Sequence, residues 1–369
     1  MQEERKRILN MVKEGKLTVN EALVLLDELG AKSDQMKKKE EELFGELSST
    51  VQFEEAKKED STSSQQKFHS TKEKIFEFVD TALKKIKDFD LDLNFGHSTD
   101  ISHIFQQGDV YLKEVDVDLA NGSVKIVPWD QKDVRVECEA KVYRVDSVDE
   151  ARNTFLKDVI FAIEGQKLRF ASQQKWMKVN ATIFIPQDHY EFVKVRMFNG
   201  SIDSENLQVD KYNVKTANGK INIDGITSKY VEAETANGKI DVRNGKIEDF
   251  EAETINGAIK VDGSFKKLEL QSFNGNVVCS LTDNRCESIE VKATTGGIKL
   301  YLPEEMAISG EAKSNLGNFN IDHTGIHVTE EKSEVIQKLL RFQPTIPTEN
   351  VTRLDLDSKT GSITLKRVK

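Results

Sequence analysis

Long apolar runs are absent from this sequence, and their absence limits where the protein is expected to work. No stretch reaches the roughly eighteen apolar residues that mark a membrane-spanning helix, and the opening residues, MQEERKRILNMVKEGK, hold no apolar run of signal-peptide length. We therefore expect a cytoplasmic protein. Two alternatives stay open: a peripheral position at the membrane, and a surface-associated position reached by a non-classical route.

Cysteine and positive charge are also scarce. The 3 cysteines, Cys138, Cys279 and Cys286, are odd in number and form no CxxC pattern, which is typical of reduced thiols in a cytoplasmic compartment. The chain carries 53 lysines and arginines against 63 aspartates and glutamates, a net charge of −10. Because phosphate binding requires a basic surface, we expect no nucleic-acid partner.

Motifs for cofactor binding and catalysis are missing as well. GxGxxG, GxxxxGK[ST] and GxSxG do not occur, so neither a phosphate-binding loop nor a serine nucleophile is indicated. His323 and His327 lie four apart, a spacing that suits a zinc pair on a helix, but Gly325 and the strand-like sequence around it argue against a helix. We expect no metal, no cofactor and no enzymatic activity.

What the sequence does contain is a repeat, within a chain of 369 residues that is long enough for two or three structural units. The fragments TANGKINIDG and TANGKIDVRN begin nineteen residues apart, at Thr216 and Thr235. Aligned on the Asn-Gly pair, the copies start at Asn199, Asn218, Asn237, Asn256 and Asn274, and weaker copies carry Thr295-Gly296, Leu316-Gly317 and Thr360-Gly361. A constant interval of this length is typical of a repeat architecture.

Apolar residues occupy fixed columns within the repeat. The third residue after each Asn or its substitute is apolar throughout: Ile202, Ile221, Ile240, Ile259, Val277, Ile298, Phe319 and Ile363. Columns of this kind indicate that each repeat meets its neighbours in one register and buries a shared core. We therefore predict a mainly β protein whose residues 109–369 form a repeat β-solenoid, one coil per repeat.

The Asn-Gly pair then has a structural role at a corner of each coil. Asn and Gly tolerate the left-handed backbone that sharp turns require, and stacked Asn side chains can hydrogen-bond along the stack. Asp224-Gly225, Asn244-Gly245 and Asp262-Gly263 mark a second corner in the same way. One alternative stays open, because VKTANGKINI would also form a two-residue hairpin. A series of such hairpins would build an antiparallel β-sandwich.

Two short helices are expected to interrupt the strands. DSVDEARNTFLKDV (residues 146–159) and TEEKSEVIQKLLRF (residues 329–342) both have helical sequence patterns.

Residues 1–30 are predicted to form a small helical hairpin. The sequence TVNE, from Thr18 to Glu21, is a capping box at the start of the second helix. Two helices this short bury little surface alone, so the apolar side of the second helix needs a further contact. Leu23, Leu26 and Leu29 are candidate partner-binding or self-association residues, and packing against the rest of the chain is the alternative.

Residues 31–70 and 71–92 differ sharply in composition. The first segment is rich in Lys, Glu, Ser and Gln and is predicted to be a flexible linker. The second contains an amphipathic helix whose apolar stripe includes Phe76, Val79, Leu83 and Ile86, with Lys84, Lys85 and Lys87 off the stripe. Such a helix either covers the end of the solenoid or lies on an anionic membrane surface.

The repeats resemble those of the bacterial putative-adhesin family of β-strand-repeat proteins, including its YvlB-like and LiaX-like members. The resemblance rests on LANGSVKIVPWDQKDVRVE from Leu119, ATIFIPQ from Ala181 and the TxNGxI coils from Asn199 onward, together with the N-terminal hairpin. It implies a non-enzymatic protein of Gram-positive bacteria in the cell-envelope stress response, linked to membrane-active antimicrobial peptides. The implied partners are membrane-associated stress-signalling proteins.

The alternative function is carbohydrate binding or cleavage, because many solenoids act on polysaccharides. Asp224 and Asp262 occupy one repeat position two coils apart, about 10 Å at a spacing of ~4.8 Å per coil. Arg243 lies between them and would hold both carboxylates ionised, which leaves no general acid. Turn formation at the glycines that follow is the simpler explanation.

Overall fold

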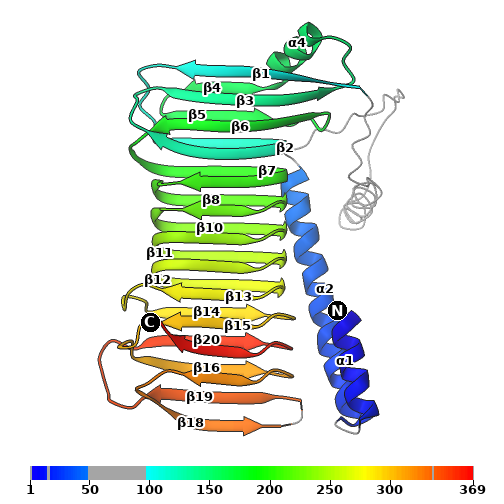
Figure 1. Cartoon of the computed structure of the whole chain (residues 1–369), viewed down its shortest axis with the longest axis vertical. Coiled ribbons are helices and arrows are strands. Elements are labelled where there is room, and N and C mark those ends of the chain that lie inside the picture. The colour runs from blue at the N-terminus through cyan, green and yellow to red at the C-terminus, as the bar shows by residue number, and fades with distance from the viewer. Residues whose placement is uncertain (1, 15–16, 49–96, 335, 369) are drawn as a thin grey trace, which may run out of the picture.

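The strands of the protein stack into one long column, shown by a computed structural model (Figure 1). The structure describes residues 2–14, 17–48, 97–334 and 336–368. Within them, 21 strands form one continuous hydrogen-bonded system. The central strands are β7 (His189–Glu205), β8 (Gln208–Asn218), β9 (Ile221–Asp224), β10 (Thr227–Asn237), β11 (Ile240–Asn256), β12 (Ile259–Asn274), β13 (Val277–Leu281), β14 (Ser288–Ala293) and β15 (Ile298–Leu302).

The pairing of these central strands is parallel and keeps the repeat in register. Asn218 of β8 lies opposite Asn237 of β10, which lies opposite Asn256 of β11, and Ile240 pairs with Ile259 in the same way. Because side chains alternate along a strand, every second residue points into one shared core. The predicted solenoid is confirmed, and the alternative of antiparallel hairpins is wrong for these coils.

The Asn corner forms a ladder of side-chain hydrogen bonds, as predicted. Each Asn donates from Nδ2 to Oδ1 of the Asn one coil earlier over 2.8–2.9 Å, through Asn199, Asn218, Asn237, Asn256 and Asn274. The first of these bonds ends on Asn121, so the ladder begins one coil before the repeats that the sequence analysis aligned.

The prediction of left-handed backbone at the Asn corner holds for Gly200, whose φ is 141°, but not for the glycines of the later coils. The φ angles of Gly238 and Gly257 lie outside the left-handed region. A Cβ on Gly257 would instead lie 1.8 Å from the carbonyl oxygen of Gly238, because successive coils touch at this corner. The prediction of left-handed backbone does hold at the second corner, where Gly225 has a φ of 71° and Asn244 a φ of 52°.

The N-terminal end of the column is closed by antiparallel strands. It contains β1 (Ser98–Gln107), β2 (Glu114–Trp129), β3 (Val134–Tyr143), α4 (Val148–Asp158), β4 (Ile160–Glu164), β5 (Lys167–Ser172) and β6 (Met177–Pro186). β3 pairs antiparallel with β1 and β6, while Phe105 stacks on Phe155 of α4 and Phe161 of β4. The β domain therefore begins at residue 98 rather than 109, and α4 confirms the helix predicted over residues 146–159.

At the C-terminal end, the last coil of the chain is inserted between two earlier coils. This end contains β16 (Ile308–Ser314), β17 (Phe319–Asp322), β18 (Ile326–Ser333), β19 (Lys338–Pro344), β20 (Thr352–Ser358) and β21 (Ile363–Arg367). β20 pairs with β14 on one side and with β16 on the other, and β21 lies in the same way between β15 and β17. The order of coils in space thus departs from their order in the sequence.

The helix predicted over residues 329–342 is wrong. The segment forms parts of β18 and β19, which pair as an antiparallel hairpin beyond β16. Leu340 and Phe342 are buried while Arg341 between them is exposed, a period of two that suits a strand and not a helix.

Two helices run beside the column: α1 (Gln2–Lys13) and α2 (Val19–Ser48), as Figure 1 shows. The hairpin predicted for residues 1–30 is present, but its second helix is longer than expected. Residues 31–48, predicted to be flexible linker, are helical because the last turns of α2 find an apolar surface on the solenoid. The rest of the predicted linker and the amphipathic helix at 71–92, with Phe76, Val79, Leu83, Ile86, Lys84, Lys85 and Lys87, lie outside the described residues.

Candidate functional site

A row of outward-facing apolar residues follows one edge of the solenoid. Each coil contributes the residue directly before its ladder Asn, and together these residues form what we call the α2 surface: Phe198, Ala217, Ala236, Ile255 and Phe273. The row exists because side chains alternate along the strand, so that Thr216 is turned inward and Ala217 outward. Both are buried, the outward residue because it lies beneath α2.

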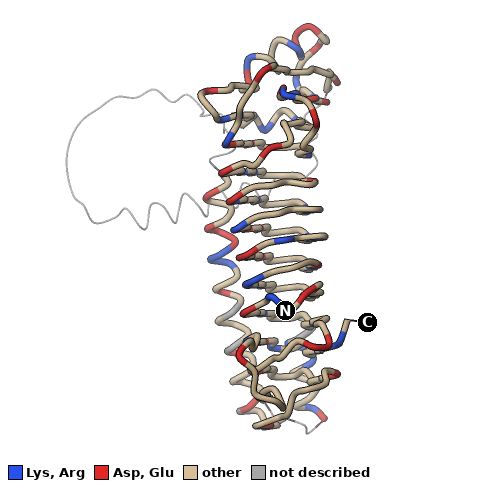
Figure 2. Tube along the Cα trace, turned by 90° about the vertical axis from the view of Figure 1, so that its left-hand side faces the viewer, with Lys and Arg blue, Asp and Glu red and all other residues tan. Residues whose placement is uncertain are grey.

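The last turns of α2 cover this surface. Leu43, Phe44 and Leu47 are buried against it and Met36 packs beside them, while the rings of Phe44 and Phe198 meet edge-on with centroids 5.7 Å apart. At the same place Asn274 donates from Nδ2 to Sδ of Met36 over 3.5 Å. The helix runs lengthwise along the stack, with charged residues on both helix and coils (Figure 2).

Charged side chains flank the apolar contact. Lys39 Nζ lies 3.1 Å from a carboxylate oxygen of Glu253, and Lys215 Nζ lies 3.6 Å from one of Glu46. Lys215 also lies 3.2 Å from Glu232 and 3.3 Å from Glu234, and only 14% of its side chain is exposed. One lysine of the solenoid thus serves three carboxylates.

Glu234 is the most perturbed carboxyl group at this contact. Burial, followed by its hydrogen bond with Glu232, raises the pKa of Glu234 to about 7, although Lys215 and Lys39 oppose the shift. The proton shared by this pair keeps two adjacent carboxylates from ionising together near neutral pH.

The N-terminal hairpin packs on the far end of the same edge. Leu25 and Leu29 are buried with Ile8, and Leu26 packs beside them together with Leu316 and Ile336 of the solenoid. The capping box is confirmed, because Thr18 N–H donates to Glu21 and Glu21 N–H donates to Thr18 Oγ1.

The three leucines predicted to bind partners therefore separate into two groups. Leu26 and Leu29 contact the chain itself, whereas 53% of Leu23 is exposed. Leu9, Val19 and Val24 are similarly exposed on the two helices. Neither these residues nor the α2 surface was predicted from the sequence. The one signal for the surface is that the residue before each Asn is apolar, and it varies between Ala, Phe and Ile.

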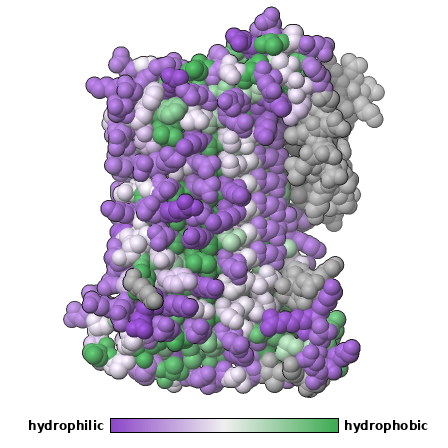
Figure 3. Space-filling model, viewed as in Figure 1, coloured by the Kyte–Doolittle hydropathy of each residue, from purple (hydrophilic) through white to green (hydrophobic). Residues whose placement is uncertain are grey.

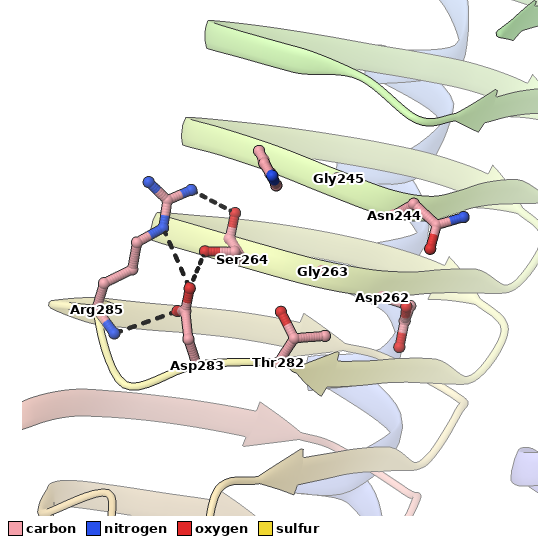
Figure 4. Close-up of a pocket in the computed structure, with 9 residues that line it drawn as sticks. Asn244, Gly245, Asp262, Gly263, Ser264, Thr282, Asp283 and Arg285 are labelled. Atoms are coloured by element: carbon pink, nitrogen blue, oxygen red, sulfur yellow. Dashed lines mark hydrogen bonds and ion pairs between the residues drawn. The ribbon is translucent and has the colours of Figure 1, made fainter. Parts of the chain in front are cut away.

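A polar groove of 470 Å³ lies at the second corner of the coils (Figure 4). Asn244 and Asp262 stand on one side and Ser264, Asp283 and Arg285 on the other, with Gly245 and Gly263 between them. The guanidinium of Arg285 donates to the carbonyls of Ile247 (3.1 Å) and Ser264 (2.6 Å), and Asp283 accepts from Ser264. These side chains bond mainly to the coils and to one another.

Of the two carboxylates considered for catalysis, Asp224 is engaged in the same manner. Asp224 accepts a 2.8 Å hydrogen bond from Asn244, and Arg243 lies 3.2 Å from Asp241. His323 approaches the carbonyl of Pro303 at 3.3 Å, and the described residues hold no cluster of three potential metal ligands.

The cysteines are buried thiols. Burial raises the pKa of Cys138 and of Cys286 to about 12 and that of Cys279 further still, which disfavours the reactive thiolate.

None of the described helices is long and apolar enough to cross a membrane. On the face shown in Figure 3, hydrophilic residues dominate the lateral surface, with smaller apolar patches between them.

Comparison with known proteins identifies the architecture. Residues 112–340 match the Toastrack DUF4097 family, and residues 3–34 match a SHOCT-like domain. The chain is 47% identical over 371 residues to the uncharacterized protein YvlB of Bacillus subtilis, covering 99% of each chain.

The solved structures to which this chain is similar include two from other bacteria. A putative adhesin from Bacteroides fragilis is 16% identical, with 73% of this chain and 97% of that chain covered and a TM-score of 0.32. A protein from Parabacteroides distasonis described as a putative lipid binding protein is 11% identical, with the same coverage and a TM-score of 0.34.

Proposed function

This chain belongs to the Toastrack DUF4097 family, and we propose that it is a non-enzymatic scaffold of the bacterial cell-envelope stress response. It binds membrane-associated stress-signalling proteins through its N-terminal helices and the lateral surface of its solenoid. Its place of work is the cytoplasm or the periphery of the membrane.

The observation that carries this proposal is the α2 surface. An apolar edge that runs along several coils and already accommodates a helix is suited to protein contacts. The hydrogen-bonded carboxylate of Asp224 and the thiols with raised pKa favour binding over catalysis.

The exposed side of the hairpin supplies a second contact. Leu9, Val19 and Leu23 are each more than half exposed, although they are large apolar residues on helices that pack by their other side. We propose that this side binds a partner or a second copy of the chain. Leu23→Ser should weaken the contact without loss of stability, because the side chain of Leu23 is largely exposed.

The experiment is affinity capture from envelope-stressed Gram-positive cells, combined with surface-protease accessibility. We expect the full chain to capture membrane signalling proteins and Leu23→Ser to capture less of them, with Lys220→Ser as the exposed control. Capture of no membrane protein, or polysaccharide turnover that disappears with Asp224→Asn, would contradict the proposal.

The segment 71–92 adds a separate question about membranes. Phe76→Ser with Val79→Ser should lower stability if the segment covers the solenoid. If it contacts lipid, the chain should bind anionic vesicles, less so at high salt or with Lys84, Lys85 and Lys87 changed to Gln. Vesicle flotation distinguishes the two, and no binding by the wild type removes the lipid contact.

A further inference from the structure

The solenoid completes its own core without α2. The side chains inside the coils form one continuous cluster, and the cluster beneath α2 is separate from it and lies on the outside of the corner. The contact with the α2 surface involves α2 residues from Met36 to Leu47, whereas the first turns of α2 pack in the hairpin beside Leu316 and Ile336. The second half of the helix is thus a ligand held by the same chain, and its release would leave the stack of coils intact.

The surface that α2 covers keeps an excess of negative charge, although Lys39 and Glu46 of the helix each lie against an opposite charge. The contact brings together Lys39 and Glu46 from α2, Lys215 from β8, Glu232 and Glu234 from β10, and Glu253 from β11. Two lysines therefore face four carboxylates. A helix with a lysine in place of Glu46 would lose the contact between Glu46 and Lys215 but would give three cations against three carboxylates, so a more basic helix balances the charge of this surface better.

We infer that the α2 surface is a docking site for a basic amphipathic helix of a partner protein, and that α2 is its resident, displaceable occupant. The inference rests on the proposed scaffold function and gives the chemistry of the partner. Counted from the residue at the place of Met36, the helix has apolar residues at i, i+7, i+8 and i+11. The partner helix has lysine or arginine at position i+3, which Lys39 occupies in α2, and at position i+10, which Glu46 occupies in α2.

The protonation of Glu234 supports an exchange of occupants near neutral pH. As the pH rises through about 7, Glu234 ionises beside Glu232 and the surface becomes more negative. The resident helix brings Glu46 to this place and is held less firmly, whereas a helix with lysine there is held more firmly.

Fluorescence anisotropy with labelled peptides tests the inference on the full chain. The probes are a peptide of residues 33–48 and the same peptide with Glu46→Lys, measured at pH 8 and low salt. The receptors are the wild type, an open variant with Phe44→Ser and Leu47→Ser, and the open variant with Ala236→Glu added. Circular dichroism establishes that each receptor keeps its strands.

We expect the open variant to bind at least about tenfold more tightly than the wild type, because its own helix no longer competes. The Glu46→Lys peptide should bind about fivefold more tightly than the resident peptide, and this advantage should shrink with salt. Ala236→Glu should abolish binding, since it places a carboxylate on the apolar row. Lys178→Ser, which changes an exposed residue of β6, should behave like the wild type.

Several outcomes would overturn the inference. They are absence of binding to a folded open variant, binding that Ala236→Glu leaves unchanged, and a resident peptide that binds as tightly as the Glu46→Lys peptide. Dimerisation of the open variant in place of peptide binding would assign the surface to a second copy. Tighter binding by a peptide of residues 72–89, whose Ile75, Ala82, Leu83 and Ile86 repeat the apolar spacing, would assign it to the chain's own segment.

The proposed function can fail separately. If capture of membrane proteins persists with Ala236→Glu, the α2 surface is not their docking site but the scaffold function stands. If the wild type captures none while the peptides bind as expected, the surface stands and the scaffold function falls.

Discussion

The middle of the solenoid and its two ends are built differently. From β7 to β13, successive coils of the chain are neighbours in space, and one repeat supplies the Asn ladder, the glycine contact and the core column. At the N-terminal end, antiparallel strands and an aromatic cluster close the stack. At the C-terminal end, β20 and β21 return to fill a place between earlier coils.

The difference reflects the contacts that a coil needs in each region. A middle coil needs only to match its two neighbours, so identical residues at a constant interval suffice. An end coil has an unpaired edge, which must be covered or made unattractive to other strands. The outermost strand β18 carries Glu330 and Lys332, which form an ion pair, and Glu330 also pairs with Arg341 of β19.

Removal of the inserted coil should produce the largest difference in stability between the C-terminal end and the middle of the solenoid. Without residues 345–369, strands β14 to β17 lose hydrogen-bonding partners on one side, and the apolar core there opens to water. We expect limited proteolysis to cut the region 284–344 rapidly while 98–281 resists. Equal resistance of the two regions would show that the last coil is dispensable.

Within the middle, Ile240→Asp is expected to lower the free energy of unfolding by about 4 kcal/mol, because it places an unpaired carboxylate between two coils. The matched control is Lys220→Asp, at an exposed side chain one coil away. Lys239→Asp, which the repeat alone suggests to be silent, is not a suitable control, because Lys239 pairs with the buried carboxylate of Asp241. Equal melting temperatures for Ile240→Asp and Lys220→Asp would refute the register.

The glycine contact gives a third test. Gly257→Ala should cost about 2–4 kcal/mol, because the new Cβ would overlap the carbonyl of Gly238 and force two coils apart. Gly108→Ala, near the N-terminal end, meets no atom within 4 Å and should be close to neutral. Chemical denaturation of both variants measures the difference, and a neutral Gly257→Ala would mean that the corner is looser than the structure shows.

Glu234→Gln should have a smaller effect that depends on pH. The pKa of Glu234 is raised from its ordinary 4.5 to about 7, so this group's stabilisation is full below the ordinary value and is lost as the pH rises through about 7. The variant should gain roughly 1–2 kcal/mol relative to the wild type between pH 5 and pH 8. Thermal unfolding at several pH values checks this, and a difference that does not change with pH would contradict the raised pKa.

The sequence predicts the middle of the fold well because its signals are local and repeated. The columns through Ile221, Ile240 and Ile259 and the Asn ladder required no knowledge of distant contacts. The insertion of β20, the strand nature of residues 329–342 and the extension of α2 to Ser48 all depend on contacts between distant parts of the chain. Helical and strand patterns compete in such segments, and the tertiary partner decides between them.

The same limit applies to the candidate site. The residue before each Asn varies between Ala, Phe and Ile, so it forms no strict column, and its role becomes visible only when α2 lies on it. The helical pattern of the sequence could have predicted that Leu23 is exposed. It could not have predicted that Leu26 and Leu29 are covered instead, because Leu316 and Ile336 contact the hairpin from the far end of the solenoid.

Backbone hydrogen exchange, followed by mass spectrometry on the full chain, tests the central claim most directly: a self-sufficient solenoid carries α2 as a releasable helix. We predict that residues 36–47 exchange much faster than coils 209–274, and that Phe44→Ser accelerates exchange in α2 alone. Protection of α2 equal to that of the coils beneath it, or loss of protection in those coils when Phe44 is replaced, would contradict the claim.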